Sequence, residues 1–354
     1  MKRLYQSLVQ LLAAGENVVL ATIFHSAGSA PRSAGAKMII RANGSIIGTV
    51  GGGRLEAETI ELAKKVQATH QSLIQPFDLT GSDAAGVGMI CGGQGDILLD
   101  YLDAGNSDNV LIFETILDTM NKAQKAWLMT ELTGQAAMAG STRQQCLVKQ
   151  DGTIIGNYQG DPAFIEKMSS GPAKISIHAD AKEDRSFIVE PIRTIGVVYL
   201  FGAGHVSQQI AKLTDMVGFI TVVIDDRPTF ANKERFPQSE ILVVEKFECM
   251  AKLAINQDSY LVIVTRGHLH DSVVLEQALQ TEAGYIGMIG SKKKRDHLFN
   301  ALQEQGVSSA TLKRVYSPIG IDIYAETPEE IAVSIVAELI KVRAERETCA
   351  TQKS

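Results

Sequence analysis

The chain has 354 residues, of which 45% are hydrophobic and 21% charged, and its formal net charge is −6. This length accommodates two domains, and a mildly acidic balance without a basic, aromatic-interleaved stripe argues against a nucleic-acid partner. No apolar run approaches the roughly 20 residues that span a bilayer, and the N-terminal residues lack the apolar core of a signal peptide. We therefore expect a cytoplasmic protein with no membrane span.

The first part of the chain, residues 1–193, combines helix and strand signals around glycine-rich loops. An amphipathic helix is followed by a strand at 17–24, a hairpin at 37–50 and a helix at 54–67. Residues 25–36, 51–53 and 80–95 are predicted loops, 124–139 a helical or mixed segment, and 160–174 a weakly structured surface segment.

Three of these loops carry candidate site residues. Arg32 is the one charged residue among small residues at 25–36, which fits either an anion clamp or a plain connector. Gly51, Gly52 and Gly53 precede a helix, so their N–H groups can bind an anion, although a tight turn is the alternative. Cys91 lies among glycines, where its thiol can reach a metal, a persulfide or a substrate, or be buried as a small hydrophobe.

The other three cysteines are not candidate site residues. Cys146 and Cys249 fall in predicted regular structure and are expected to be structural, and Cys349 lies in a polar tail at 346–354. The absence of a CxxC pair predicts neither a zinc site nor a disulfide framework.

The first domain contains an internal repeat. Residues 38–53 and 146–161 share a hairpin pattern at an offset of 108 residues (146 − 38). We therefore expect an α+β domain built on a sheet of two similar hairpins with helices between them. The second copy lacks the triple glycine and the cysteine, which favours a site in the first copy.

Residues 194–345 alternate strands with helices, which predicts a Rossmann-type, doubly wound parallel sheet. A strand at 197–201 runs into Gly202-Ala203-Gly204-His205, with Ser207 in place of a third glycine, and the next strand ends at Asp225. The predicted ligand residues follow the strand ends: Gly202, Ala203, Gly204, His205, Asp225, Asp226, Arg227, Arg266, His268, Ser291 and Lys292.

The predicted roles of these residues leave the ligand open. Gly202 and Gly204 would bring backbone amides to a phosphate. Asp225 would accept hydrogen bonds from ribose hydroxyls, whereas Arg227 suits a 2′-phosphate, so NAD and NADP both remain candidates. His205 or His268 could donate a proton if the protein were an NAD(P)-dependent oxidoreductase. A nucleotide-sensing regulatory protein is a further alternative.

A set of motifs resembles one family, the XdhC/CoxI accessory factors of xanthine dehydrogenase and related molybdenum hydroxylases. The resemblance covers nearly the whole chain, at residues 28–35, 51–56, 89–93, 200–206, 225–227, 265–268, 285–291 and 317–320.

The resemblance implies that the protein binds molybdenum cofactor transiently and delivers it, after sulfuration, to an apo molybdenum hydroxylase. It also implies a cysteine desulfurase as sulfur donor and a homodimer. Within that picture Arg32 would hold the pterin phosphate, and Cys91 would contact molybdenum or relay sulfur.

Overall fold

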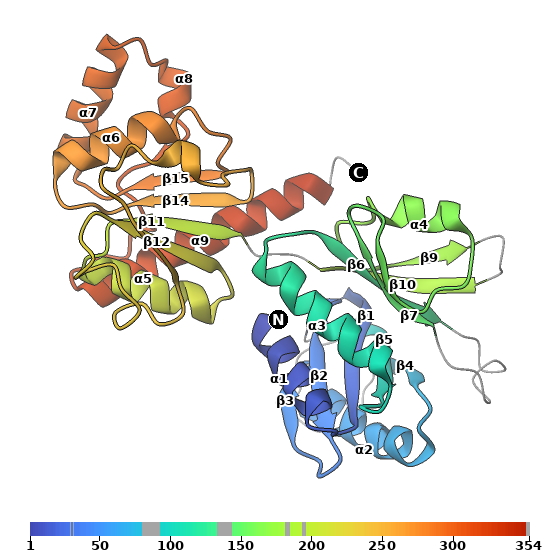
Figure 1. Cartoon of the computed structure of the whole chain (residues 1–354). Helices are drawn as coiled ribbons and strands as arrows, with labels where there is room; N and C mark the ends of the chain where they lie inside the picture. Colours follow the sequence, from blue (N-terminus) through green and yellow to red (C-terminus); the bar gives the residue numbers. More distant parts are fainter. Residues whose placement is uncertain are drawn as a thin grey trace. The chain divides into compact units, whose positions relative to one another are not determined.

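The computed structural model describes residues 1–28, 30, 32–79, 93–132, 144–180, 185–192 and 196–351, with the backbone alone for 268, 269 and 347–351. The chain divides into two compact units, Met1–Arg193 and Thr194–Ser354 (Figure 1). Each unit is described by itself below.

Unit 1 holds two five-stranded sheets of identical topology. Sheet A has the order β3-β2-β1-β5-β4 and sheet B the order β8-β7-β6-β10-β9, with antiparallel pairing between the neighbouring strands. The strands of sheet A are β1 Val18–Gly28, β2 Lys37–Arg41, β3 Ile46–Gly48, β4 Leu73–Asp78 and β5 Gly93–Leu102. Those of sheet B are β6 Ala126–Leu132, β7 Gln145–Lys149, β8 Ile154–Gly156, β9 Ser176–Asp180 and β10 Arg185–Ile192.

Helices fill the space between the sheets and cover their outer faces. The helices are α1 Lys2–Ala13, α2 Gly53–Thr69, α3 Ser107–Asn121 and α4 Pro162–Met168. Apolar residues of α1 and α3 share one buried cluster with residues from both sheets. Helix α2 packs on the other face of sheet A and α4 on the other face of sheet B (Figure 1).

The repeat seen in the sequence is a repeat of structure. Helix α1 and strands β1 to β3 reappear as α3 and β6 to β8, and equivalent residues meet: the rings of Tyr5 and Phe113 stack with centroids 6.1 Å apart. Gly48 and Gly156 both have positive φ, and an added Cβ at either would overlap Leu4 or Ile112 from the preceding helix. One expectation was wrong, because the two hairpins lie in separate sheets rather than in one.

Polar residues cross between the two sheets in the same repeated pattern. The Lys37 ammonium lies 2.8 Å from a Glu190 carboxylate oxygen and donates to Thr22 at 2.9 Å. In the second half, Gln145 Nε2 donates to Asp100 at 3.2 Å and to Thr130 at 2.9 Å. Each half of unit 1 thus supplies a donor side chain to the buried carboxylate of the other half.

Three segments of unit 1 differ from the sequence prediction. Strand β1 continues through His25 to Gly28, past a register shift between Ile23 and His25. The segment expected to be helical or mixed contains β6, because its Ala126–Leu132 stretch is buried almost throughout and pairs on both sides. The segment expected to be weakly structured contains α4, which buries Phe164, Ile165 and Met168.

Unit 2 has a six-stranded parallel sheet in the order β13-β12-β11-β14-β15-β16. The strands are β11 Val197–Phe201, β12 Ile220–Asp225, β13 Glu240–Val243, β14 Ser259–Ile263, β15 Tyr285–Met288 and β16 Val315–Tyr316. This is the strand order of the Rossmann fold, so the predicted fold class is confirmed.

Helices lie on both faces of this sheet (Figure 1). Helices α5 His205–Met216 and α9 Pro328–Thr351 pack together in the cluster on one face. The other face carries η2 Met250–Lys252, α6 His268–Ala278, α7 Lys292–Glu304 and α8 Ser309–Leu312. Helix α9 begins with a capping box, in which Thr327 and Glu330 exchange hydrogen bonds of 3.1 and 3.2 Å. Within the described part of the chain, no helix is both long and apolar enough to cross a membrane.

Candidate functional site

The candidate site of unit 2 lies where the strand order reverses. Strands β11 and β14 are neighbours in the sheet, and the chain leaves their carboxyl ends into α5 and α6. Ligands of open α/β sheets bind in the crevice at such a reversal. The glycine turn after β11 and the segment from Thr265 to Gly267 after β14 flank this position.

The two glycines of the turn are there for different reasons. Gly202 has φ +106, and an added Cβ would lie 2.4 Å from the Val264 carbonyl oxygen, so the protein itself requires glycine. Gly204 has an ordinary φ of −74, and an added Cβ would meet no atom of the described residues within 4 Å. Since the fold does not demand glycine at 204, the open space beside it can admit a ligand that approaches the backbone closely.

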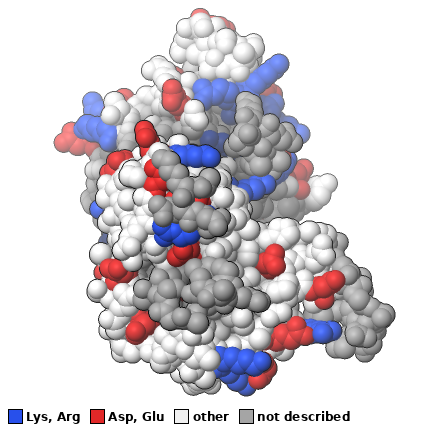
Figure 2. Space-filling model, turned by 90° about the vertical axis from the view of Figure 1, so that its right-hand side faces the viewer, with Lys and Arg blue, Asp and Glu red and all other residues white. Residues whose placement is uncertain are grey.

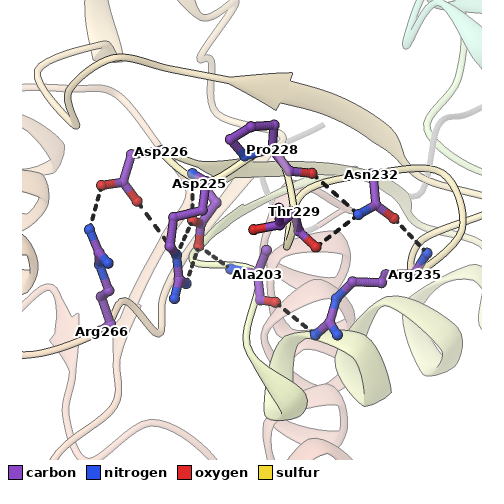
Figure 3. A network of polar contacts seen from close by, with 9 residues as sticks. Ala203, Asp225, Asp226, Pro228, Thr229, Asn232, Arg235 and Arg266 are labelled. Atoms are coloured by element: carbon purple, nitrogen blue, oxygen red, sulfur yellow. Dashed lines mark hydrogen bonds and ion pairs between the residues drawn. The ribbon is translucent and has the colours of Figure 1, made fainter.

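The Asp225 carboxylate is hydrogen-bonded to groups of the protein itself. Its side chain is 2% exposed and accepts hydrogen bonds from the Ala203 amide at 2.7 Å and from the backbone and guanidinium of Arg227 at 2.8 to 3.0 Å (Figure 3). Burial raises the pKa of this carboxyl, but the hydrogen bonds from Arg227 and Ala203 outweigh it and hold the pKa below its ordinary value. The carboxylate predicted to bind ribose is thus occupied by donors of the chain itself.

Arg235 is a site residue that the sequence analysis missed. Its Nη2 donates to the Ala203 carbonyl oxygen at 3.2 Å, and Asn232 Oδ1 accepts from its backbone amide at 3.0 Å (Figure 3). Its guanidinium lies 5.0 Å from the centre of the Phe230 ring, and that of Arg227 lies 3.9 Å from it. Arg235 stands ten residues beyond Asp225, outside any motif, so only the folded loop reveals it.

Asp226 and Arg266 join the two sides of the crevice. Arg266, from the segment after β14, donates to Asp226 at 2.7 Å, after β12 (Figure 3). The second Asp226 oxygen is buried and accepts no hydrogen bond from the described residues, and it lies 3.7 Å from Arg227 Nε. The Ser207 hydroxyl, at the third position of the glycine motif, is also buried and has no hydrogen-bond partner among the described residues.

Three arginines therefore lie around the glycine turn, and they differ in whether a carboxylate pairs with the guanidinium. Arg227 is paired with Asp225, and Arg266 with Asp226. Arg235 pairs with no carboxylate among the residues that the structure describes, and its buried Nε has no hydrogen-bond partner there. An uncompensated guanidinium against a glycine turn favours an anionic ligand.

The helix starts around the crevice also differ from one another. Helices α5 and α6 are preceded by Gly204 and Gly267, and no side chain caps either helix. By contrast, Ser291 caps α7 and accepts from the Lys294 amide at 3.3 Å. Lys292 follows as an exposed first residue of α7.

Of the two predicted proton donors, only His205 has a described side chain. His205 is an exposed first residue of α5, and the His268 side chain lies outside the described part of the structure. The His270 ring lies 5.0 Å from that of Phe247, and the Asp271 carboxylate accepts from Thr265 at 2.5 Å.

The described parts of two candidate loops of unit 1 touch at one end of sheet A. Gly28, at the end of β1, pairs with Gly93, at the start of β5. An added Cβ at Gly93 would lie 2.3 Å from the Ala30 amide nitrogen, so the two segments touch. Arg32 is exposed nearby in the chain, whereas Cys91 lies outside the described residues.

The triple glycine is explained by its own backbone. Gly51, Gly52 and Gly53 have φ of +130, +74 and +56, which side-chain-bearing residues rarely adopt. The Gly51 amide donates to Thr49 at 3.0 Å and the Gly52 amide to Glu56 at 3.3 Å. Because these amides are engaged and one acceptor is a carboxylate, the turn is less suited to an anion than the sequence indicated.

Two cysteines are well defined, and both are buried free thiols. Burial raises the pKa of Cys146 to about 12 and also raises that of Cys249. Among the described residues no group of three or more His, Cys, Asp or Glu side chains is placed to hold a metal. Both acidic and basic side chains are exposed on the face shown in Figure 2.

The fold and the site define a two-unit α/β protein. One unit is a duplicated α+β scaffold, and the other is a Rossmann-type unit with an arginine-lined glycine turn. The model of the XdhC Rossmann domain matches residues 198–339, and that of the XdhC and CoxI family matches residues 11–78. The chain belongs to the XdhC/CoxI family.

Known proteins are similar over nearly the whole length. A probable xanthine dehydrogenase subunit from Bacillus subtilis is 26% identical over 335 residues, covering 94% of this chain and 95% of that protein. The molybdenum cofactor insertion chaperone PaoD of Escherichia coli is 21% identical, covering 96% and 87%. A crystal structure titled as a xanthine dehydrogenase from Bacillus halodurans has a TM-score of 0.78 at 26% identity, covering 97% and 96%.

Proposed function

We propose that this protein is an accessory factor of a xanthine dehydrogenase-type molybdenum hydroxylase. It binds molybdenum cofactor, keeps it while its terminal sulfur is installed, and delivers it to the apo-hydroxylase. The observation that carries the proposal is family membership across both units, together with near full-length similarity to a molybdenum cofactor insertion chaperone. A cysteine desulfurase as sulfur donor and a homodimeric state belong to the same proposal.

The crevice of unit 2 suits the phosphate end of such a cargo. The open space beside Gly204 and the unpaired charge of Arg235 are features that a phosphate group needs. His205, Arg266 and Lys292 are further cofactor-binding candidates at the carboxyl ends of the strands.

The candidate place for the sulfur chemistry is the end of sheet A at which Gly28 and Gly93 lie. Gly28, which precedes Arg32 in the chain, pairs with Gly93, which follows Cys91 in the chain. We propose that Arg32 contacts the cargo and that Cys91 contacts molybdenum or relays sulfur, since a soft thiolate suits both tasks.

The direct test is to identify the cargo. The full-length protein is purified from molybdenum-replete cells, and its extract is oxidised and assayed for pterin fluorescence. We expect bound molybdopterin, and we expect the loaded protein to activate an apo-hydroxylase that free protein does not activate. Turnover of a substrate with NAD(P)H, by protein that releases no pterin, would overturn the proposal in favour of an oxidoreductase.

A further inference from the structure

The ligand preference of unit 2 can be read from how its charged residues are already paired. Rossmann units that bind NAD use an acid at the end of the second strand to accept hydrogen bonds from the ribose hydroxyls. Asp225 holds that place in this chain, at the end of β12. Its partners therefore decide whether a dinucleotide can use the site.

Both oxygens of the Asp225 carboxylate are in use. One accepts from Ala203 and Arg227 Nη2, and the other accepts from the Arg227 amide and Nε. A ribose could reach the carboxylate only by displacing charge-assisted hydrogen bonds inside a buried site, which are among the stronger ones in proteins. The pair of Asp225 and Arg227 therefore closes the position that an NAD ribose would take.

The same pair also works against NADP. An arginine near this strand end recognises the 2′-phosphate of NADP when its guanidinium is available. Arg227 is held by Asp225, and its guanidinium is stacked on Phe230. The neighbouring carboxylate of Asp226 adds negative charge where that phosphate would lie.

The glycine turn itself remains suited to a phosphate. Arg235 brings a guanidinium without a carboxylate partner, in the described part of the chain, to the Ala203 carbonyl. Its buried Nε lacks a hydrogen-bond partner there, although an arginine donates through all five N–H groups when it can. A compact anionic group beside Gly204 would balance this charge.

We infer that unit 2 takes a ligand ending in a phosphomonoester, with Arg235 as its anion-binding residue, and that the Asp225–Arg227 pair rejects nicotinamide dinucleotides. This inference rests on the proposed function, because a pterin phosphate is such a ligand. It goes further by assigning Arg235 and by excluding NAD and NADP from the site.

The test titrates the full-length protein with inorganic phosphate by calorimetry, and with NADH and NADPH by nicotinamide fluorescence. We expect phosphate to bind, and neither dinucleotide to bind more tightly than phosphate does. Arg235→Gln should weaken phosphate binding roughly tenfold or more, the loss of one charge-assisted hydrogen bond. Lys233→Gln is the matched control, since Lys233 donates to the Ser239 carbonyl in the same loop and should leave phosphate binding unchanged.

Two results would overturn the inference. One is binding of NADH or NADPH that is tighter than phosphate binding and is competed by phosphate. The other is wild-type affinity for phosphate in folded Arg235→Gln protein, with folding checked by circular dichroism. Pterin release is assayed on the same preparations: dinucleotide binding with bound pterin overturns only this inference, whereas Arg235-dependent phosphate binding without pterin overturns only the carrier role.

Discussion

Lys37 and Gln145 stand at equivalent positions of the two halves of unit 1, and each reaches the acid of the opposite sheet. The Lys37 ammonium lies 2.8 Å from Glu190, and Gln145 Nε2 lies 3.2 Å from Asp100. One half thus uses a buried ion pair where the other uses an amide and a carboxylate. The difference can be measured.

Replacing Lys37 should be much more harmful than replacing Gln145. Lys37→Met strands Glu190 as a buried charge without its cation, which should lower the free energy of unfolding by ~3–5 kcal/mol. Gln145→Met removes the hydrogen bonds to Asp100 and Thr130, at ~1 kcal/mol each, while Asp100 keeps its bond from Ser72. Urea unfolding followed by the fluorescence of Trp127, the single tryptophan and part of unit 1, gives both values. Equal losses in the two variants would contradict the charge assignment.

Alkaline pH should destabilise unit 1. Burial raises the pKa of the Cys146 thiol from 9.0 to about 12, and burial and Glu190 raise that of the Tyr5 hydroxyl well above 10.0. From about pH 9 upwards the unfolded chain releases protons that the folded chain keeps, so the free energy of unfolding falls as the pH rises towards 12. Unfolding of Cys146→Ala, followed at Trp127 from pH 8 to 11 (approximate limits set by these ordinary pKa values), should show a smaller decline. An identical slope in both proteins would rule out a contribution from Cys146.

The two glycines of the turn should respond differently to alanine. Gly202→Ala forces a Cβ into the Val264 carbonyl at a φ of +106 and should cost ~1–3 kcal/mol of stability. Gly204→Ala should change stability by less than ~0.5 kcal/mol, because its φ is ordinary and its surroundings are open. Thermal unfolding by circular dichroism checks both. A severe loss in Gly204→Ala would show that the protein, and not a ligand, requires that glycine.

Cys91→Ser should separate folding from function. We expect the variant to fold with the melting temperature of the wild type and to yield inactive hydroxylase, because serine cannot replace the thiolate. Cys349→Ser is the control and should support full target activity, since that cysteine lies near the end of α9, which continues to Thr351 through much of the expected polar tail at 346–354. Normal hydroxylase activity with Cys91→Ser would remove this cysteine from the mechanism.

The sequence predicted the elements whose signals are local. The hairpin at 37–50 depends on neighbours a few residues apart, and it is confirmed. Strand β6 and helix α4 were missed because tertiary burial fixes them: β6 is buried between two partner strands, and α4 packs its apolar residues on sheet B.

The same distinction holds for the candidate site of unit 2. The glycine turn was found because the motif is continuous in sequence. The occupation of Asp225 by Arg227 and the approach of Arg235 to Ala203 depend on how the loop after β12 folds back. No sequence spacing predicts either contact. The residue pattern alone therefore predicted that Asp225 binds a ribose, whereas in the structure its carboxylate is occupied by other donors.

The duplication in unit 1 has a consequence for how such a protein can change. Two identical subunits must mutate together, because every substitution appears on both sides of their twofold axis. Joining the two copies in one polypeptide removes that constraint, so one copy can keep the packing surface while the other acquires reactive loops. The Lys37–Glu190 and Gln145–Asp100 contacts record this divergence inside the core.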